Sequence, residues 1–153
     1  MDYVTLKWLH IMASTFLFGT GVGSAFYLAF ATMNHDMRAI AVATRHVVLA
    51  GWLFTMTTIV LVPFSGVVLI RMAGLPMASR WLLWSFGLYA VTVLCWIPAA
   101  WLQVRMRDVA SAAAQSDSPP MIYWRYFSIW VALGIPAFIS LVIAFYLMTA
   151  KPA

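Results

Sequence analysis

Four long apolar runs constrain the fold of this chain more than any other feature of its sequence. They cover roughly residues 8–32, 47–70, 81–104 and 126–149. Each has about 24 residues, enough for a helix to cross a hydrocarbon core of about 30 Å with some tilt. Because backbone groups in lipid must be satisfied within the protein, each run is predicted to be a helix. The sequence therefore predicts an all-α integral membrane protein with a four-transmembrane-helix bundle, which forms a single membrane domain over residues 1–153.

The composition agrees with a chain whose solvent is mostly lipid. Hydrophobic residues make up 65% of the sequence and charged residues only 8%, whereas soluble domains have roughly a quarter charged residues. The net charge of +5 comes from basic residues spread between the apolar runs. This pattern favours the lipid bilayer as the partner and argues against nucleic acid. A single cysteine, Cys95, excludes both an intrachain disulfide and a zinc site of the CxxC type.

The segments between the runs contain the expected boundary residues. Met1–Lys7 is a poor signal-peptide n-region, and the following apolar run is too long for an h-region, so the first run is predicted to be a retained helix. Ser79 is a plausible N-cap for the third helix. Pro63, Pro98 and Pro136 fall inside spans, where the membrane tolerates them as kinks.

Basic residues give a narrow preference for one orientation. Four spans put both termini on the same side of the membrane, together with the segment between the second and third spans. The positive-inside rule favours cytoplasmic loops at residues 33–46 and 105–125, since five cations flank that side and four the other. With a retained first helix, we expect a multi-pass protein of the bacterial inner (plasma) membrane.

His10 is the only histidine within the apolar runs. It lies about 4.5 Å deeper than Lys7 at the helical rise of about 1.5 Å per residue. The helical period places Ser14 and Gly21 on the same face, in a stripe of mostly small residues. Ionisable groups inside a membrane usually have a function. The simpler interpretation is that the small residues only allow close helix packing, and that His10 bonds a carbonyl or water.

Three further cations are expected at the same rim of the bundle as Lys7. They are Arg71, Arg80 and Lys151. A neutral imidazole ringed by cations suits a flat apolar molecule with acidic groups, and haem b fits this description. Its iron takes an imidazole nitrogen, its macrocycle needs apolar walls and its propionates need Lys or Arg. The simpler interpretation is that basic residues flank most membrane helices.

Other chemistry has little support in the sequence. His46 follows Arg45 at the opposite side of the membrane from His10, so it would form a second site or contact lipid headgroups. No Asp or Glu lies within a span, so proton and cation pathways lack their usual residues. No catalytic residues are predicted, and the sequence leaves open whether the protein is an enzyme.

Several motifs together resemble a family of uncharacterised bacterial four-helix integral membrane proteins, a domain of unknown function. These motifs are "LKWLHI", "FGTGVGSAFY", "ATRHVVLAGWLFT", "WLQVRMRDVA", "YWRYF", "GIPAF" and the terminal "AKP". The resemblance covers nearly the whole chain and implies a four-helix membrane protein without an assigned activity.

A more distant resemblance is to HemJ-type protoporphyrinogen IX oxidases, which are small four-helix haem-binding membrane proteins. It is carried by "WLHIMASTFLFGTG", "AFYLAF", Gly66 and "IPAFISLVIAFYLMTAKP". The resemblance implies that His10 matches a proposed haem ligand. The chain lacks the arginine that follows "FYLP", the early lysine of the third helix and the "NE" pair of that family. These departures argue against the same oxidation.

Two functional hypotheses follow from these observations. The first is a membrane protein that binds haem b, with His10 as the metal ligand and Lys7, Arg71, Arg80, Lys151, Ser14 and Gly21 around the cofactor, for electron transfer or redox sensing. The alternative is a cofactor-free accessory or scaffold protein, which holds a protein partner or a second copy in the bilayer through Gly19, Gly23 and its proline-containing helices.

Overall fold

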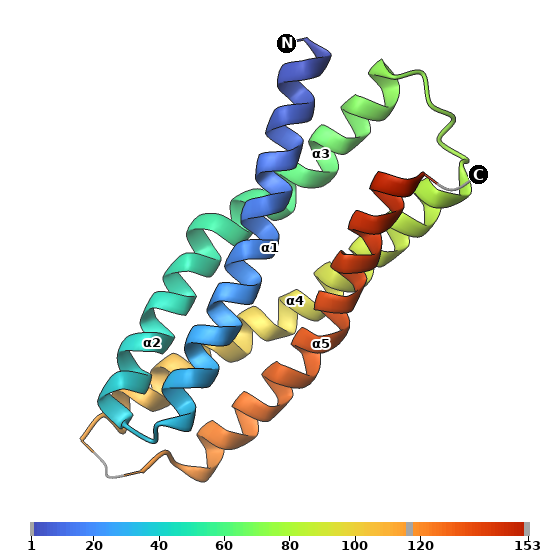
Figure 1. The fold of residues 1–153 in the computed structure, drawn as a ribbon. Coiled ribbons are helices and arrows are strands. Elements are labelled where there is room, and N and C mark those ends of the chain that lie inside the picture. Colours follow the sequence, from blue (N-terminus) through green and yellow to red (C-terminus); the bar gives the residue numbers. More distant parts are fainter. Residues whose placement is uncertain (1, 116–117, 152–153) are drawn as a thin grey trace.

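The computed structural model describes residues 2–115 and 118–151, and it contains four helical segments long and apolar enough to cross a membrane. The second segment consists of two α-helices joined by a π-helical turn. The elements in chain order are α1 (Tyr3–Met33), α2 (Met37–Ala50), η1 (Gly51–Thr55), α3 (Met56–Met72), α4 (Arg80–Ala112) and α5 (Met121–Ala150). The predicted all-α membrane bundle is confirmed (Figure 1).

The helices extend beyond the predicted apolar runs, most clearly after the first span. The sequence predicted a loop over residues 33–46, but α2 already begins at Met37. Asp36 caps this helix by accepting a hydrogen bond from the Arg38 backbone N–H at 2.9 Å. Ile40 and Thr44 lie on the buried face of its first turns. Arg38 and Arg45, which suggested a loop, therefore lie on the exposed face of an amphipathic helix.

The second connection, at residues 105–125, also contains helix at both ends. Helix α4 continues to Ala112 and α5 begins at Met121. Ser79 does occupy the N-cap position of α4, but its hydroxyl donates to the Pro76 carbonyl at 2.7 Å and does not cap the helix. All three spans that contain a proline continue through it as helix.

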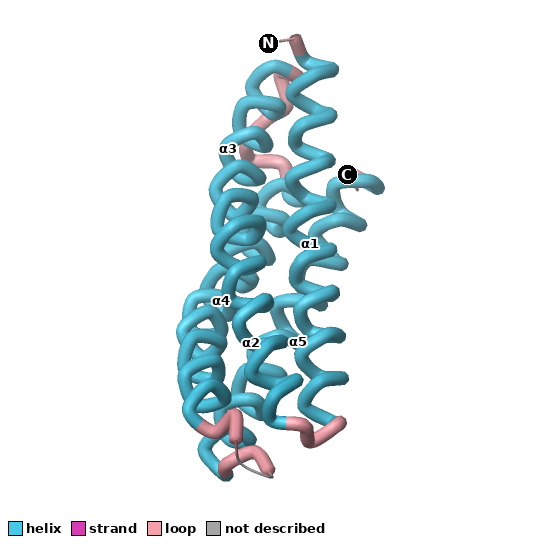
Figure 2. The backbone as a smooth tube through the Cα atoms, turned by 90° about the vertical axis from the view of Figure 1, so that its left-hand side faces the viewer, coloured by secondary structure: helices cyan, strands magenta, loops and turns pink. Residues whose placement is uncertain are grey.

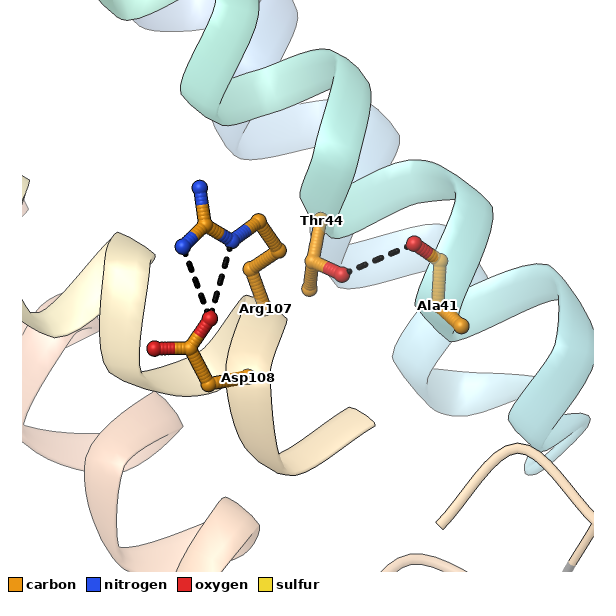
Figure 3. A network of polar contacts seen from close by, with 4 residues as sticks. All are labelled: Ala41, Thr44, Arg107 and Asp108. Atoms are coloured by element: carbon orange, nitrogen blue, oxygen red, sulfur yellow. Dashed lines mark hydrogen bonds and ion pairs between the residues drawn. The ribbon is translucent and has the colours of Figure 1, made fainter. Parts of the chain in front are cut away.

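One end of the bundle is closed by a large cluster of buried side chains. It lies at the end where α1 turns into α2 and where α4 connects to α5 (Figure 1). Four of its side chains are fully buried: Leu28, Ile40, Met106 and Tyr123. Figure 3 shows polar contacts at this end: Arg107 pairs with Asp108 on α4 at 2.7 Å, and the Thr44 hydroxyl on α2 donates to the Ala41 carbonyl at 3.1 Å. We call this region the closed end.

The other half of the bundle is packed more loosely. It separates into a pair made by α1 and α3 and a pair made by α4 and α5 (Figure 1). Figure 2 shows α3 beside α1 toward the N-terminal end. Its buried cluster contains only Ala13, Leu17 and Val62. The Tyr89 hydroxyl on α4 donates to the Ile59 carbonyl on α3 at 2.6 Å and links the two pairs. We call this region the open half, and it contains His10.

Candidate functional site

The imidazole of His10 is anchored to α3 by one hydrogen bond. His10 lies in the third turn of α1, and its Nδ1 is 2.8 Å from the Ser65 Oγ. Ser65 is only 2% exposed. Its hydroxyl also donates to the Leu61 carbonyl at 2.6 Å. The contact therefore joins the two helices of the α1–α3 pair at a buried hydroxyl.

The hydrogen bonds of Ser65 are compatible with a neutral His10 ring that is protonated on Nδ1. A serine hydroxyl has one proton and two acceptor lone pairs. Because the Ser65 proton is directed to the Leu61 carbonyl, the hydroxyl can accept the proton of His10 Nδ1–H. The neutral ring then has its free lone pair on Nε2, where a metal or a hydrogen-bond donor can bind.

A glycine allows the close approach of His10 to α3. A Cβ atom added to Gly66 would lie 3.3 Å from His10 Cε1 and 3.8 Å from His10 Nδ1. The first distance is shorter than most carbon contacts. A larger residue at this position would therefore push the imidazole away from Ser65. Gly66 was associated with this region only through the HemJ-type resemblance, and the structure gives it a physical role.

The four predicted cations all lie toward the end of the bundle that contains both chain termini. Lys7 is in the second turn of α1, and Arg71 is in the last turn of α3, which ends near the N-terminus in Figure 1. Arg80 begins α4 and Lys151 follows α5, and these two helix ends lie together (Figure 1). All four side chains are exposed, and no ion pair involves them within residues 2–115 and 118–151.

The remaining two predicted site residues do not surround the imidazole. The Ser14 hydroxyl donates to the His10 carbonyl at 2.8 Å, within its own helix. Gly21 lies about 16 Å from His10 along the helix axis, given a rise of about 1.5 Å per residue. It lines a separate cavity in the middle of the bundle. The structure therefore brings His10 together with Ser65 and Gly66, which the spacing argument did not include.

His46 lies far from this region. It is an exposed residue of α2, close to the closed end, while His10 is in the open half. In the part of the chain that the structure describes, no three His, Cys, Asp or Glu side chains group together as a metal site would require. An iron bound at His10 would therefore need its other ligands from a cofactor, not from further side chains of this kind.

The mid-bundle cavity is the feature that sequence reasoning missed. It has a volume of about 520 Å³ and is lined by residues from every helical element. Its wall includes Gly51 and Thr55 of the π-helical turn η1 and Gln103 of α4. Gln103 is visible in the sequence as a polar residue late in an apolar run, but the π-helical turn has no signature that we could recognise.

Comparison with known families settles the classification of the chain. A family described as predicted integral membrane proteins, DUF2269, matches residues 4–152. The chain belongs to this family. The match covers nearly the whole sequence, as the first resemblance predicted, and supports an integral membrane protein of unknown function.

The other comparisons add no relatives to this DUF2269 protein. Neither the curated proteins nor the solved structures contain a match. The resemblance of the DUF2269 chain to HemJ-type oxidases therefore stays a prediction from its motifs. A functional site in this protein can therefore be argued only from the positions and contacts of its own residues.

Proposed function

We propose that this DUF2269 protein binds haem b through His10 and uses it for electron transfer or redox sensing. The observation that carries the proposal is the hydrogen bond between His10 Nδ1 and the Ser65 Oγ, 2.8 Å long. It orients the ring, and with the proton on Nδ1 the free lone pair would lie on Nε2. Metal-binding histidines nearly always have such a partner on their second nitrogen.

The donor set around His10 fits haem. Haem supplies its own ring nitrogens and needs one axial ligand from the protein, together with apolar walls. Ser65 would hold the imidazole, and Gly66 would keep it close to α3. Lys7 and Arg71, at the outer ends of the same helix pair, are the cations best placed for the propionates. When bound, haem would supply one-electron chemistry.

The first experiment is an absorption spectrum of the detergent-purified protein, oxidised and dithionite-reduced. We expect a Soret band with reduced b-type α and β bands, lost in His10→Ala. The matched control is His46→Ala, which changes an exposed histidine of α2 and should retain the bands. A colourless protein that also fails to take up added haemin would contradict the proposal.

The role of Ser65 gives a second, more specific test. Removal of the outer partner of a metal-binding histidine typically weakens binding by about 10- to 100-fold. Ser65→Ala should therefore weaken haemin binding by roughly that factor without abolishing it. Ser14→Ala is the control, because its hydroxyl bonds a carbonyl of its own helix. Equal haemin affinity in both variants would show that Ser65 has no such role.

We also propose, as the alternative, a scaffold function through Gly19 and Gly23 of α1. Both are exposed, and added Cβ atoms there would meet no other atom within 4 Å. This leaves a small-residue face on which a helix of a protein partner or a second copy could pack closely. Gly23→Leu should then dissociate an oligomer or a co-purified partner in detergent, whereas Gly87→Leu should not. A monomer without haem or a co-purified protein would contradict both proposals.

A further inference from the structure

We propose that the mid-bundle cavity binds a neutral, lipid-soluble molecule with a carbonyl-bearing head, the chemistry of an isoprenoid quinone. The inference does not depend on haem binding, since His10 is not among the residues that line the cavity. It rests on the size and charge of the cavity and on polar groups that have no partner at its π-helical side.

The cavity has the dimensions and the wall of a ligand site. Its volume of about 520 Å³ lies within the range of roughly 300–1,000 Å³ that is typical of small-molecule sites. No charged residue lines it, and most of its wall is aliphatic or aromatic. It lies between segments that cross the membrane, so a molecule dissolved in lipid could reach it. A charged ligand would find no counter-ion there.

A mostly buried threonine whose hydroxyl has no hydrogen-bond partner among the described residues borders this cavity. Thr55 is 7% exposed and ends the π-helical turn η1. Among the described residues, its hydroxyl makes no hydrogen bond, although the Thr55 carbonyl accepts one from Thr58 at 3.3 Å. No fully enclosed side-chain polar atom in the described chain lacks a partner. The Thr55 hydroxyl must therefore face open space, and the cavity is the space that Thr55 lines.

Two further donors lie on the same side of the cavity. Gln103 and Trp96 are separated by seven residues on α4, so they share a helix face. Both line the main cavity together with Gly51, and the same three residues line a small adjoining void. Neither side chain has a hydrogen bond within the described residues. A hydroxyl, an amide and an indole N–H all donate, and the indole only donates, so the group they would recognise is an acceptor such as a ring carbonyl.

Glycines keep the cavity open. Gly51 is one turn from Thr55, and a Cβ atom there would lie 3.5 Å from Gln103 Oε1, so a longer side chain would displace the amide. Gly21 and Gly134 also line the cavity, and added Cβ atoms would meet nothing within 4 Å. A leucine at position 134 would therefore extend into empty space. Gly134→Leu is therefore a variant that should fill the cavity without a clash.

The test uses the full chain in lipid nanodiscs with decylubiquinone as the probe. Trp96 and Trp130 line the cavity, so we measure tryptophan fluorescence quenching as the probe is added. We expect saturable quenching that becomes weaker by about tenfold or more in Gly134→Leu, since a filled pocket excludes the ligand. The matched control is Gly87→Leu, which also enters open space but does not line the cavity. Equal, unsaturable quenching in the two variants would overturn the proposal.

A second pair of measurements tests the head group without filling the cavity. Thr55→Val keeps the shape of the side chain and removes the donor, so the dissociation constant should rise by about tenfold for one lost hydrogen bond. Decane, which lacks the quinone ring, should compete poorly for the site. If decane competes as well as the quinone and Thr55→Val binds normally, the cavity is a hydrocarbon pocket and the proposed head-group recognition is wrong.

Discussion

The closed end and the open half of this bundle are packed differently. At the closed end, α1, α2, α4 and α5 meet around side chains that are fully buried, including Met106 and Tyr123. In the open half, α3 packs mainly against α1, and the buried cluster contains only Ala13, Leu17 and Val62. The mid-bundle cavity lies between them. The comparison indicates that the closed end holds the helices together, while an open cavity lies beside the more loosely packed half.

The largest expected effect is loss of the central aromatic ring of the closed end. Tyr123→Ala should lower the free energy of unfolding by about 3–5 kcal/mol, as for other large buried aromatic side chains. The control is Tyr146→Ala, in the same helix but 68% exposed toward lipid. Unfolding in mixed detergent and SDS micelles measures both. A similar loss for the two variants would refute the distinction between the closed end and the rest of the bundle.

A larger side chain should destabilise the closed end but should be tolerated at the mid-bundle cavity. Ala43 is 0% exposed at the closed end, so Ala43→Leu should cost about 1–3 kcal/mol through overpacking. Gly134→Leu enters the cavity and should be neutral or slightly stabilising, because leucine favours a helix over glycine by somewhat less than about 1 kcal/mol. The same SDS unfolding assay checks the contrast. A strongly destabilised Gly134→Leu variant would mean that the cavity closes in the membrane.

A smaller effect is expected for the polar contact within the closed end. The Tyr123 hydroxyl lies 2.8 Å from the Thr32 Oγ1, and both residues are buried. Hydrogen bonds between membrane helices have average coupling energies of about 0.6 kcal/mol. A double-mutant cycle with Tyr123→Phe and Thr32→Val should give about this value. A coupling near zero would show that packing alone stabilises the closed end.

The smallest effect concerns the start of α1, at the outer edge of the open half. Asp2 caps the helix, and its carboxylate accepts hydrogen bonds from the side chain and the backbone N–H of Thr5, which lower its pKa below the usual value. The folded pKa is lower than the unfolded one, so the cap stabilises the helix above the unfolded pKa. This contribution is lost as the pH falls through the folded pKa.

Amide exchange of the first helical turn measures this cap. We expect protection of Leu6 to decrease in acid in the wild type, and to be low and independent of pH in Asp2→Ala, which removes the capping oxygen. Protection around Tyr123 should stay unchanged in both proteins, since the closed end does not depend on this cap. Equal protection of Leu6 at all pH values would show that Asp2 does not stabilise the helix start.

The sequence predicted the helices of this protein more reliably than its sites. A long apolar run in lipid forms a helix, because backbone groups without hydrogen bonds are too unfavourable there. The amphipathic start of α2 was missed, since its polar face resembled a loop. His10 was recognised as unusual from its surroundings, but its neighbours Ser65 and Gly66 come from α3. No local pattern could have placed them against it.

The sequence by itself determined the membrane environment, the helical class and the number of spans, because length and hydropathy act locally along the chain. The family match over residues 4–152 agrees with the membrane environment. Only the tertiary structure decided which helices pair, that the Ser65 hydroxyl meets His10, and that Thr55 borders an apolar cavity. These features depend on the packing of segments far apart in sequence, and small changes in side-chain volume on two helices decide whether a space is filled or left open.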